Sequence, residues 1–217
     1  MSSSPIASKV NRRDELLKVA IRLFGQRGFH GTSMGDIATE TGLQKASLYH
    51  WVESKEDLLY HVLSGALDLL LVQARAVSGD ERLAFEVKLR SLITLHSEYT
   101  VSHPDVMHVF LSEAKWLGGP RGREIRDVRK QYHRLYEDVF YEARERGEIL
   151  APANAVPVYV NLLFSMTNHL PVWFRQEGTY SPRQVADLVS DLVLRNVLPD
   201  QAQDVERRSN SWRDIAE

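Results

Sequence analysis

Five residues with hydrogen-bonding side chains lie close together between positions 44 and 50. They are Gln44, Lys45, Ser47, Tyr49 and His50. The apolar residues between them are Leu43, Ala46 and Leu48, and a short helix with this spacing turns its apolar residues inward and its polar residues outward. Small and polar side chains on an exposed helix face can donate to and accept from base edges in the major groove of DNA. The segment is therefore a candidate reading helix for double-stranded DNA.

Three further residues are candidates for holding the phosphate backbone. Thr32 and Ser33 precede a predicted helix, where free backbone N–H groups and the helix dipole favour a phosphate oxygen. Lys55 opens the next long predicted helix and brings a positive charge. Phosphate contacts of this kind position a protein on the duplex, while base contacts choose the sequence.

Ser33 also lies within Gly31-Thr32-Ser33-Met34-Gly35, which has the G-x-S-x-G pattern of serine hydrolases. That nucleophile needs a strand before it and a helix after it, within an alternating α/β chain. Here an amphipathic helix pattern precedes Ser33, and the sequence shows no strand pattern. We therefore expect no catalytic residues, and a hydrolase built on Ser33 is only a distant alternative.

Metal and cofactor chemistry lacks its usual signals. The sequence has no cysteine, and its eight histidines show neither an H-E-x-x-H motif nor a paired spacing. The glycines at 118, 119 and 122 lack the preceding strand and the lysine of a nucleotide-binding loop. We expect neither a metal ion nor a cofactor.

The overall charge of −2 over 217 residues gives no general basic field, although the first 27 residues hold six basic against two acidic side chains. No apolar run reaches the ~18 residues of a membrane span, because Asp68 interrupts the early stretch and Asn161 and Asn168 the later one. Met1 to Pro5 lack the features of a signal peptide. We expect a cytoplasmic protein without a membrane partner.

The first 76 residues carry signals for four helices, two short ones lying between two longer ones. Apolar residues from 16 to 24 repeat with helical spacing, and Gly28 is expected to end that helix. Capping boxes at Ser33 and Ser54, each with an acidic residue three positions later, start the second and the fourth helix. Residues 44–51 form the third. Two short helices around a glycine-containing turn have the spacing of a helix-turn-helix.

The rest of the chain is also predicted to be helical. Helical periods occur at 85–96, from Pro104 to Phe110 and at 125–139, while residues 154–174 are apolar around most of the helix. Ser181 with a following proline starts a last helix that reaches about residue 197. The expected fold class is all-α, with about nine helices.

The pattern across the first 60 residues is carried by Phe24, Gly28, Phe29, Thr32, Ser33, Ile37, Ala38, Gly42, Leu43, Lys45, Leu48, Tyr49, Ser54, Lys55, Glu56 and Leu58. Over about residues 12–60 this pattern resembles the DNA-binding domain of TetR-family transcriptional repressors. In that family the residues that match Thr32, Lys45, Tyr49 and Lys55 commonly touch DNA, so the resemblance implies the same role here.

The resemblance implies a division of the chain into three parts. Residues 1–54 would form the helix-turn-helix domain, with a flexible arm at 1–10, residues 55–200 the ligand-binding and dimerisation domain, and residues 201–217 a polar tail. Family members bind a palindromic DNA operator as homodimers and respond to a small molecule. The helices at 154–174 and 181–197 carry more apolar surface than one layer of partners absorbs, which predicts a homodimer interface through them.

In the family, the effector occupies a largely apolar cavity of the C-terminal domain. The candidate lining residues here are Phe110, Trp116, Tyr132, Tyr136, Phe164, Asn168 and Trp173. The helix from Arg121 to Gly147, followed by an apolar helix ending in Pro171–Phe174, is similar to members that sense acyl-coenzyme A thioesters. An acyl-CoA is therefore the first candidate effector. The alternative effector is a hydrophobic drug-like compound that controls an efflux operon. The alternative function is that of a DNA-binding protein that senses no ligand.

Overall fold

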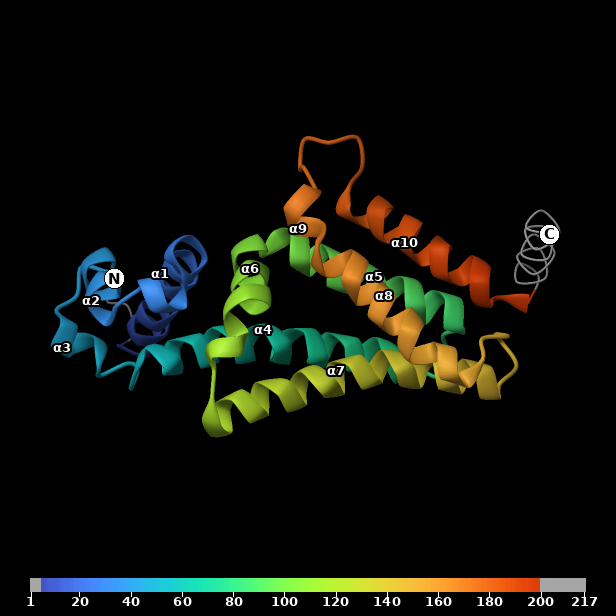
Figure 1. The fold of residues 1–217 in the computed structure, drawn as a ribbon, viewed down its shortest axis with the longest axis horizontal. Helices are drawn as coiled ribbons and strands as arrows, with labels where there is room; N and C mark the ends of the chain where they lie inside the picture. Colours follow the sequence, from blue (N-terminus) through green and yellow to red (C-terminus); the bar gives the residue numbers. More distant parts are fainter. Residues whose placement is uncertain (1–4, 200–217) are drawn as a thin grey trace, which may run out of the picture. The chain divides into compact units, whose positions relative to one another are not determined.

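A computed structural model describes residues 5–199, with side chains placed from residue 12 onward. This part of the chain is helical and contains no strand, so the predicted all-α fold class is confirmed (Figure 1). Its elements are α1 (Pro5–Gly31), α2 (Met34–Glu40), α3 (Lys45–Leu48), α4 (Lys55–Ser78), α5 (Phe85–Ser102), α6 (Pro104–Glu113), the 3-10 helix η1 (Ala114–Trp116), α7 (Gly119–Glu145), the 3-10 helix η2 (Ala153–Ala155), α8 (Val156–Asn168), α9 (Leu170–Trp173) and α10 (Pro182–Val197). The predicted polar tail, 201–217, lies outside the described residues.

The chain divides into two compact units. Among the described residues, unit 1 holds 5–69 together with 103–129, and unit 2 holds 70–102 together with 130–199. Helices α4 and α7 contribute residues to both units. The helix-turn-helix therefore shares its compact unit with the first half of α4, with α6 and with the start of α7. The functional boundary expected at residues 54 and 55 stays a prediction.

Unit 1 is organised around one apolar core. Its fully buried members include residues from each of its long segments, namely Leu16, Leu23, Phe24, Ile37, Leu48, Leu59, Val109 and Leu117. Helix α1 packs against both α2 and α6. Burying a leucine, isoleucine or phenylalanine side chain stabilises a fold by roughly 1.5–3 kcal/mol, so residues far apart in the sequence hold this unit together.

The helix boundaries predicted for the first unit are largely met. Helix α1 breaks at Gly28, where its end was expected, and one further turn follows it. The capping box predicted at Ser33 is present at the start of α2. The third helix is shorter than predicted: α3 covers residues 45–48, whereas 44–51 were expected. Its last residues tighten into a turn in which the Trp51 N–H donates to the Leu48 carbonyl at 2.9 Å.

The predicted capping box at Ser54 forms only in part. The Ser54 hydroxyl accepts from the N–H of Asp57 at 3.1 Å, but the Asp57 carboxylate accepts from the N–H of Glu53 at 3.0 Å. The same buried carboxylate lies 2.7 Å from the guanidinium of Arg121 on α7. Asp57 therefore ties the start of α4 to the start of α7 as well as capping its own helix.

In unit 2, α5 is the central element and packs against α8, α9 and α10. Its contacts with α7 include the rings of Phe85 and Phe140, whose centroids lie 5.0 Å apart. The buried Lys88 donates to the carbonyl of Ser78, the last residue of α4, at 2.7 Å. A lysine at the C-terminus of a helix satisfies an otherwise unpaired carbonyl and complements the helix dipole. Residues from α4, α5 and α7 are thus joined within this unit.

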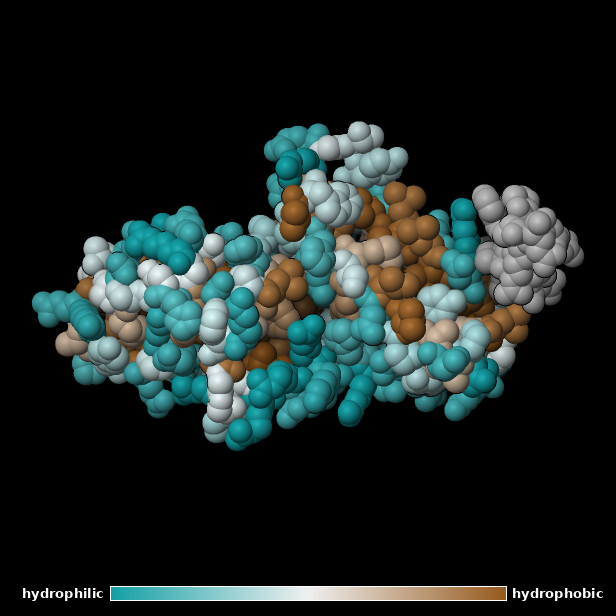
Figure 2. Space-filling view, in the orientation of Figure 1, coloured by the Kyte–Doolittle hydropathy of each residue, from teal (hydrophilic) through white to brown (hydrophobic). Residues whose placement is uncertain are grey.

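Apolar side chains remain exposed on two neighbouring helices of unit 2. On α8, Val156, Val160, Leu163 and Phe164 are buried, whereas Val158 and Leu162 face outward. On α10, Leu188 and Leu192 are 52% and 59% exposed. Figure 2 shows hydrophobic surface gathered over these two helices. Residues 154–174, predicted as one apolar helix, instead form η2, α8 and α9, and α8 is covered on only one side within a single chain.

One described helix, α4, is long and apolar enough to cross a membrane by length and composition. Asp68 lies within it, and half of the apolar window is buried in the structure. Core helices of soluble proteins meet the same criterion, so this is weak evidence for a membrane span.

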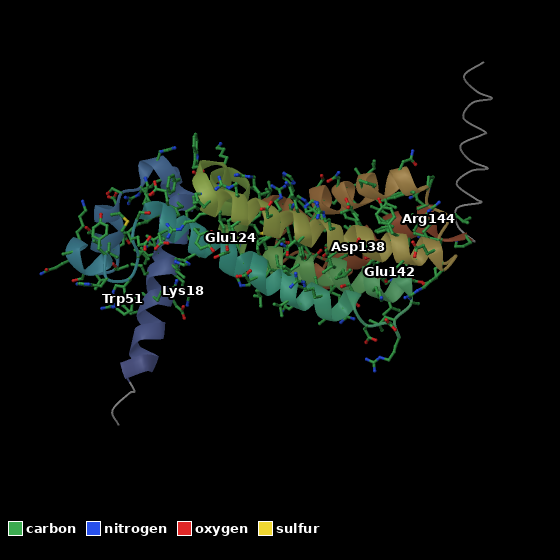
Figure 3. All side chains as sticks on the ribbon, turned by 90° about the horizontal axis from the view of Figure 1, so that it is seen from below. Lys18, Trp51, Glu124, Asp138, Glu142 and Arg144 are labelled. Atoms are coloured by element: carbon green, nitrogen blue, oxygen red, sulfur yellow. The ribbon has the colours of Figure 1, made fainter. Side chains whose placement is uncertain are left out.

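Unit 2 also has a groove of about 390 Å³ between the C-terminal part of α4 and α7. Its lining combines Arg75 and Arg134 with Asp138 and Glu142, over an apolar floor that includes Leu135. Figure 3 shows Asp138 and Glu142 one turn apart along α7. Charges of both signs line this groove, in contrast to the apolar cavity expected for an effector.

Candidate DNA interface and effector site

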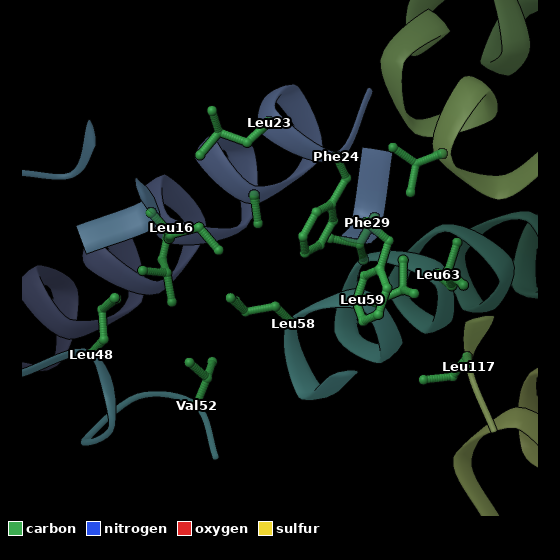
Figure 4. Packing of buried hydrophobic residues seen from close by; sticks show 14 of the residues in the cluster. Leu16, Leu23, Phe24, Phe29, Leu48, Val52, Leu58, Leu59, Leu63 and Leu117 are labelled. Carbon is green, nitrogen blue, oxygen red and sulfur yellow. The ribbon is translucent and has the colours of Figure 1, made fainter. Parts of the chain in front are cut away.

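The reading helix α3 is held by its single buried side chain. Leu48 is fully buried in the core of unit 1, and Val52 follows it into the same core (Figure 4). The turn before α3 depends on Gly42, whose φ of 65° is disfavoured for residues with a Cβ atom. The Leu43 N–H donates back to the Ala38 carbonyl at 2.9 Å and closes this turn. The short helix is therefore fixed at both ends.

The remaining residues around α3 present hydrogen-bonding groups outward. Gln44, Lys45, Tyr49 and His50 are exposed, and Ser47 is half-buried. Tyr49 is 50% exposed, so it is not a core aromatic. Ala46 is exposed as well, and its predicted place on the inner face is wrong because the short helix turns only Leu48 fully inward. This surface offers donors, acceptors and one flat ring.

Two of the residues predicted to hold phosphates are committed to the protein itself. Thr32 is 1% exposed, and the one hydrogen of its hydroxyl is shared between the carbonyls of Gly28 at 3.0 Å and Leu23 at 3.2 Å. The ammonium of Lys55 donates to the carbonyls of Phe29 at 2.7 Å and Thr32 at 2.8 Å. The same ammonium lies over the ring of Phe29, 4.3 Å from its centroid. Both side chains thus shape the connection from α1 to α2.

Ser33 caps α2, but an acidic residue faces it. The Ser33 hydroxyl donates to Asp36 at 2.5 Å, and the Ser33 N–H donates to the same carboxylate oxygen at 2.8 Å. The hydrogen bond from the Ser33 hydroxyl is the main cause that lowers the pKa of Asp36. The start of α2 therefore already carries an anion that occupies two of the donors expected for a phosphate.

Four of the seven predicted effector residues gather around one histidine in unit 2. The Nδ1 atom of His96 lies 3.2 Å from the hydroxyl of Tyr132, and its Nε2 atom lies 3.0 Å from Oδ1 of Asn168. The hydroxyls of Tyr132 and Tyr136 are 3.1 Å apart, and Tyr136 donates to the Leu92 carbonyl at 2.9 Å. The ring of Phe164 packs edge-on to His96 with centroids 5.1 Å apart.

This cluster, made of His96, Tyr132, Tyr136, Phe164 and Asn168, is electrically neutral at pH 7. Burial lowers the pKa of His96 to about 4, although the hydrogen bond with Asn168 acts in the opposite direction. Burial also raises the pKa of Tyr132 and of Tyr136. Buried polar chains of this kind are costly unless every group is paired, so they mark candidate functional sites.

The amide of Asn168 is the open end of this chain. Its Oδ1 atom faces Nε2 of His96 at 3.0 Å, and its NH2 group supplies two N–H donors. Asn168 is half-buried, so these donors are within reach of another molecule.

The other three predicted effector residues lie elsewhere. Phe110 and Trp116 belong to unit 1, where Phe110 packs against the apolar core and the Trp116 ring lies 4.3 Å from that of His30. Trp173 is in unit 2 but is 55% exposed. None of the three is part of the cluster around His96.

His96, the centre of the cluster, is a residue that sequence reasoning missed as a site. A signal was present, because His96 interrupts an otherwise apolar helical face at 85–96. A buried imidazole on such a face needs partners for both ring nitrogens, and the partners proved to be Tyr132 and Asn168. The sequence alone could not show which residues those were.

Known proteins match both parts of the chain. The family model described as "Bacterial regulatory proteins, tetR family" matches residues 16–62, and the one described as "Tetracyclin repressor-like, C-terminal domain" matches residues 84–197. The HTH-type transcriptional repressor KstR2 of Mycobacterium tuberculosis strain H37Rv is 30% identical over 194 residues, which is 88% of this chain and 96% of the relative. KstR2 of Rhodococcus jostii strain RHA1 is 26% identical over 189 residues, covering 87% and 92%.

Solved structures give the same result. The ketosteroid transcriptional regulator KstR2 of M. tuberculosis superposes with a TM-score of 0.76 at 29% identity, covering 86% of this chain and 95% of the other. AibR in complex with isovaleryl coenzyme A and operator DNA superposes with a TM-score of 0.73 at 26% identity, covering 83% and 97%. These relatives are transcriptional regulators and not enzymes, so Ser33 is a helix cap and not a nucleophile. The chain belongs to the TetR family of transcriptional regulators.

Proposed function

We propose that this chain is a repressor that binds a palindromic operator as a homodimer and releases it when a small effector binds in unit 2. The observation that carries the proposal is the exposed polar surface of α3, held in place by the fully buried Leu48. A repressor with two such surfaces, related by a two-fold axis, reads two half-sites of one operator.

The residues predicted to contact DNA have different proposed roles. Lys45 and Tyr49 are assigned to DNA, with Gln44, Ser47 and His50 as further contacts, since all five side chains are exposed or half-buried. Lys55 is half-buried, and its charge is proposed to attract a phosphate oxygen in addition to holding the carbonyls of Phe29 and Thr32. Thr32 and Ser33 act indirectly, because their side chains hold the start of α2.

The homodimer is proposed to form through α8 and α10. Val158 and Leu162, and likewise Leu188 and Leu192, are four residues apart and lie on one exposed face of each helix. Two copies that pair these faces would bury the apolar surface in a four-helix interface.

The effector is proposed to bind beside the cluster around His96. Aromatic rings and neutral hydrogen-bonding groups suit a ligand with a large apolar body and a neutral carbonyl, which the free N–H of Asn168 can bind. AibR is a relative whose structure holds isovaleryl coenzyme A, and KstR2 is named a ketosteroid regulator. An acyl-CoA thioester is therefore the first choice, and a hydrophobic drug-like compound is the alternative. Operator DNA and CoA thioesters are both found in the cytoplasm, where we place the protein.

DNA binding can be tested without knowing the operator. Duplexes with a random central region are selected on the purified chain, and the affinity of the enriched sequence is measured by fluorescence anisotropy. We expect an inverted repeat whose half-site centres are ~34–36 Å apart or a multiple of that distance. Selection that enriches no sequence, or only single half-sites bound by one chain, would contradict the proposal.

A further inference from the structure

The break in α1 leaves backbone groups without helical partners. Gly28 has φ 73° and ψ 162°, a region of backbone space that is essentially restricted to glycine. A helix cannot continue through this conformation, so N–H and carbonyl groups on both sides of it need other partners.

Three side chains supply those partners. Thr32 donates to the carbonyls of Gly28 and Leu23, and Lys55 donates to those of Phe29 and Thr32. The N–H of Phe29 donates to Oε2 of Glu113, the last residue of α6, at 2.8 Å. We call the segment from Gly28 to Thr32, with these bonds, the α1–α2 joint.

The joint determines where α2 and α3 begin. Thr32 is followed at once by Ser33, the N-cap of α2, and α2 leads through its tight turn to α3. Of the three side chains that hold the joint, Thr32 lies within it and Lys55 opens α4, while Glu113 comes from α6. A hydrogen bond to an ionised carboxylate is stronger than one between neutral groups.

Other contacts support the same approach of α6 to α1. The rings of His30 and Trp116 lie edge-on with centroids 4.3 Å apart, and a Cβ atom added at Gly25 would lie 3.7 Å from Cδ2 of His108. The buried Val109 belongs to the same core as Phe24 and Phe29. The joint is thus packed against α6 and η1 over more than one helical turn.

We propose that Glu113 is a positioning residue for operator binding, because its carboxylate holds the Phe29 N–H and so fixes the direction in which α2 and α3 leave α1. The proposal rests on the proposed operator binding. Since two half-sites must be met at once, a small change at each reading helix weakens both contacts.

The test compares three variants of the full-length chain. Glu113→Ala removes the acceptor, and Glu113→Gln keeps an acceptor oxygen without the charge. Ser112→Ala is the matched control, because the Ser112 hydroxyl donates only within its own helix, to the His108 carbonyl at 2.7 Å. For each variant the dissociation constants for the selected operator and for a scrambled duplex of equal length are measured at one salt concentration. Amide hydrogen exchange is followed for the peptide that contains Phe29.

Loss of one charge-assisted bond at the joint should weaken operator binding about tenfold in Glu113→Ala, with a smaller effect in Glu113→Gln. Binding of the scrambled duplex should change less than about twofold, since phosphate contacts tolerate a shifted reading helix. The Phe29 peptide should exchange faster in Glu113→Ala, and Ser112→Ala should match the wild type in each measurement.

An operator affinity of Glu113→Ala equal to that of Ser112→Ala would overturn the assignment. An equal loss for operator and scrambled duplex would overturn it too, because a general loss of structure and not positioning would then be the cause. If Glu113→Ala does not fold, the same comparison is made with Glu113→Gln. A wild-type chain that selects no duplex contradicts operator binding itself, whereas normal selection with an unchanged variant contradicts only the role of Glu113.

Discussion

The Nδ1 atom of His96 lies 3.2 Å from the hydroxyl of Tyr132, inside a part of unit 2 where both side chains are buried. The pair belongs to a chain of hydrogen bonds that ends at the Leu92 carbonyl and leaves the amide of Asn168 partly exposed. His96 is neutral at pH 7, because burial lowers its pKa. The arrangement makes the stability of unit 2 depend on pH.

Protonation of His96 should destabilise the fold at mildly acidic pH. Burial holds its pKa at about 4 in the folded chain, below the ordinary value of 6.5. Between these values the unfolded chain binds a proton that the folded chain does not, so stability is complete above pH 6.5 and falls as the pH decreases toward 4. Each pH unit within this window costs up to about 1.4 kcal/mol. Urea unfolding at pH 7 and pH 5 measures the difference.

The control for this prediction is a pair of variants. His96→Gln should show a smaller loss of stability between pH 7 and pH 5 than the wild type, whereas His50→Gln, at an exposed position, should keep the wild-type loss. Equal losses in wild type and His96→Gln would show that His96 is not the responsible group.

Lys45→Ala and Tyr49→Ala should each weaken operator binding while the fold is retained, since both side chains are exposed. A lost phosphate contact at Lys45 lowers the salt slope of binding by about one unit, while a lost base contact relaxes specificity at one position by ~1–3 kcal/mol. Arg123→Ala is the control, because Arg123 is an exposed basic residue of α7 in unit 1, outside the reading surface. Unchanged affinity in both α3 variants would remove this helix from the DNA interface.

Leu188→Asp should convert the dimer to a monomer. Leu188 is exposed on α10 in the single chain. A buried charge without an opposite charge beside it costs roughly 3–5 kcal/mol, so an aspartate at this position would oppose pairing of the apolar faces. Val72→Asp changes an apolar residue on α4 that is 66% exposed, compared with 52% for Leu188, and should leave the dimer intact. Light scattering coupled to gel filtration at micromolar concentration distinguishes the two states, and a wild-type monomer would contradict the proposed interface.

Local sequence signals predicted the helices well where the chain itself supplies the cap or the break. The capping boxes at Ser33 and Ser181 and the break at Gly28 depend on residues within four positions of one another. The length of α3 was overestimated, because the burial of Leu48 and Val52 ends this helix early and burial depends on the core around it.

The residues of the DNA interface were easier to predict from the sequence than those of the joint and the effector site, because they depend on local spacing and not on contacts between distant segments. The polar surface of α3 follows from spacing along one short helix, so Gln44, Lys45, Tyr49 and His50 were identified from the sequence. The inward-facing hydroxyl of Thr32 and the partner of Phe29 could not be identified, because they depend on contacts between segments up to 84 residues apart. Tyr132 and Asn168 were predicted as separate residues, but only the fold shows that His96 joins them.

Coupling between effector and operator is the central claim, and a double titration tests it most directly. Isovaleryl coenzyme A is titrated into the full-length chain with and without the selected operator, with coenzyme A and isovalerate as separate controls. If binding of the effector releases DNA, the operator must weaken effector binding by the same factor by which the effector weakens operator binding, typically ~5–150-fold. We predict matching factors within this range. Effector affinity that is measurable but identical with and without operator would contradict the account.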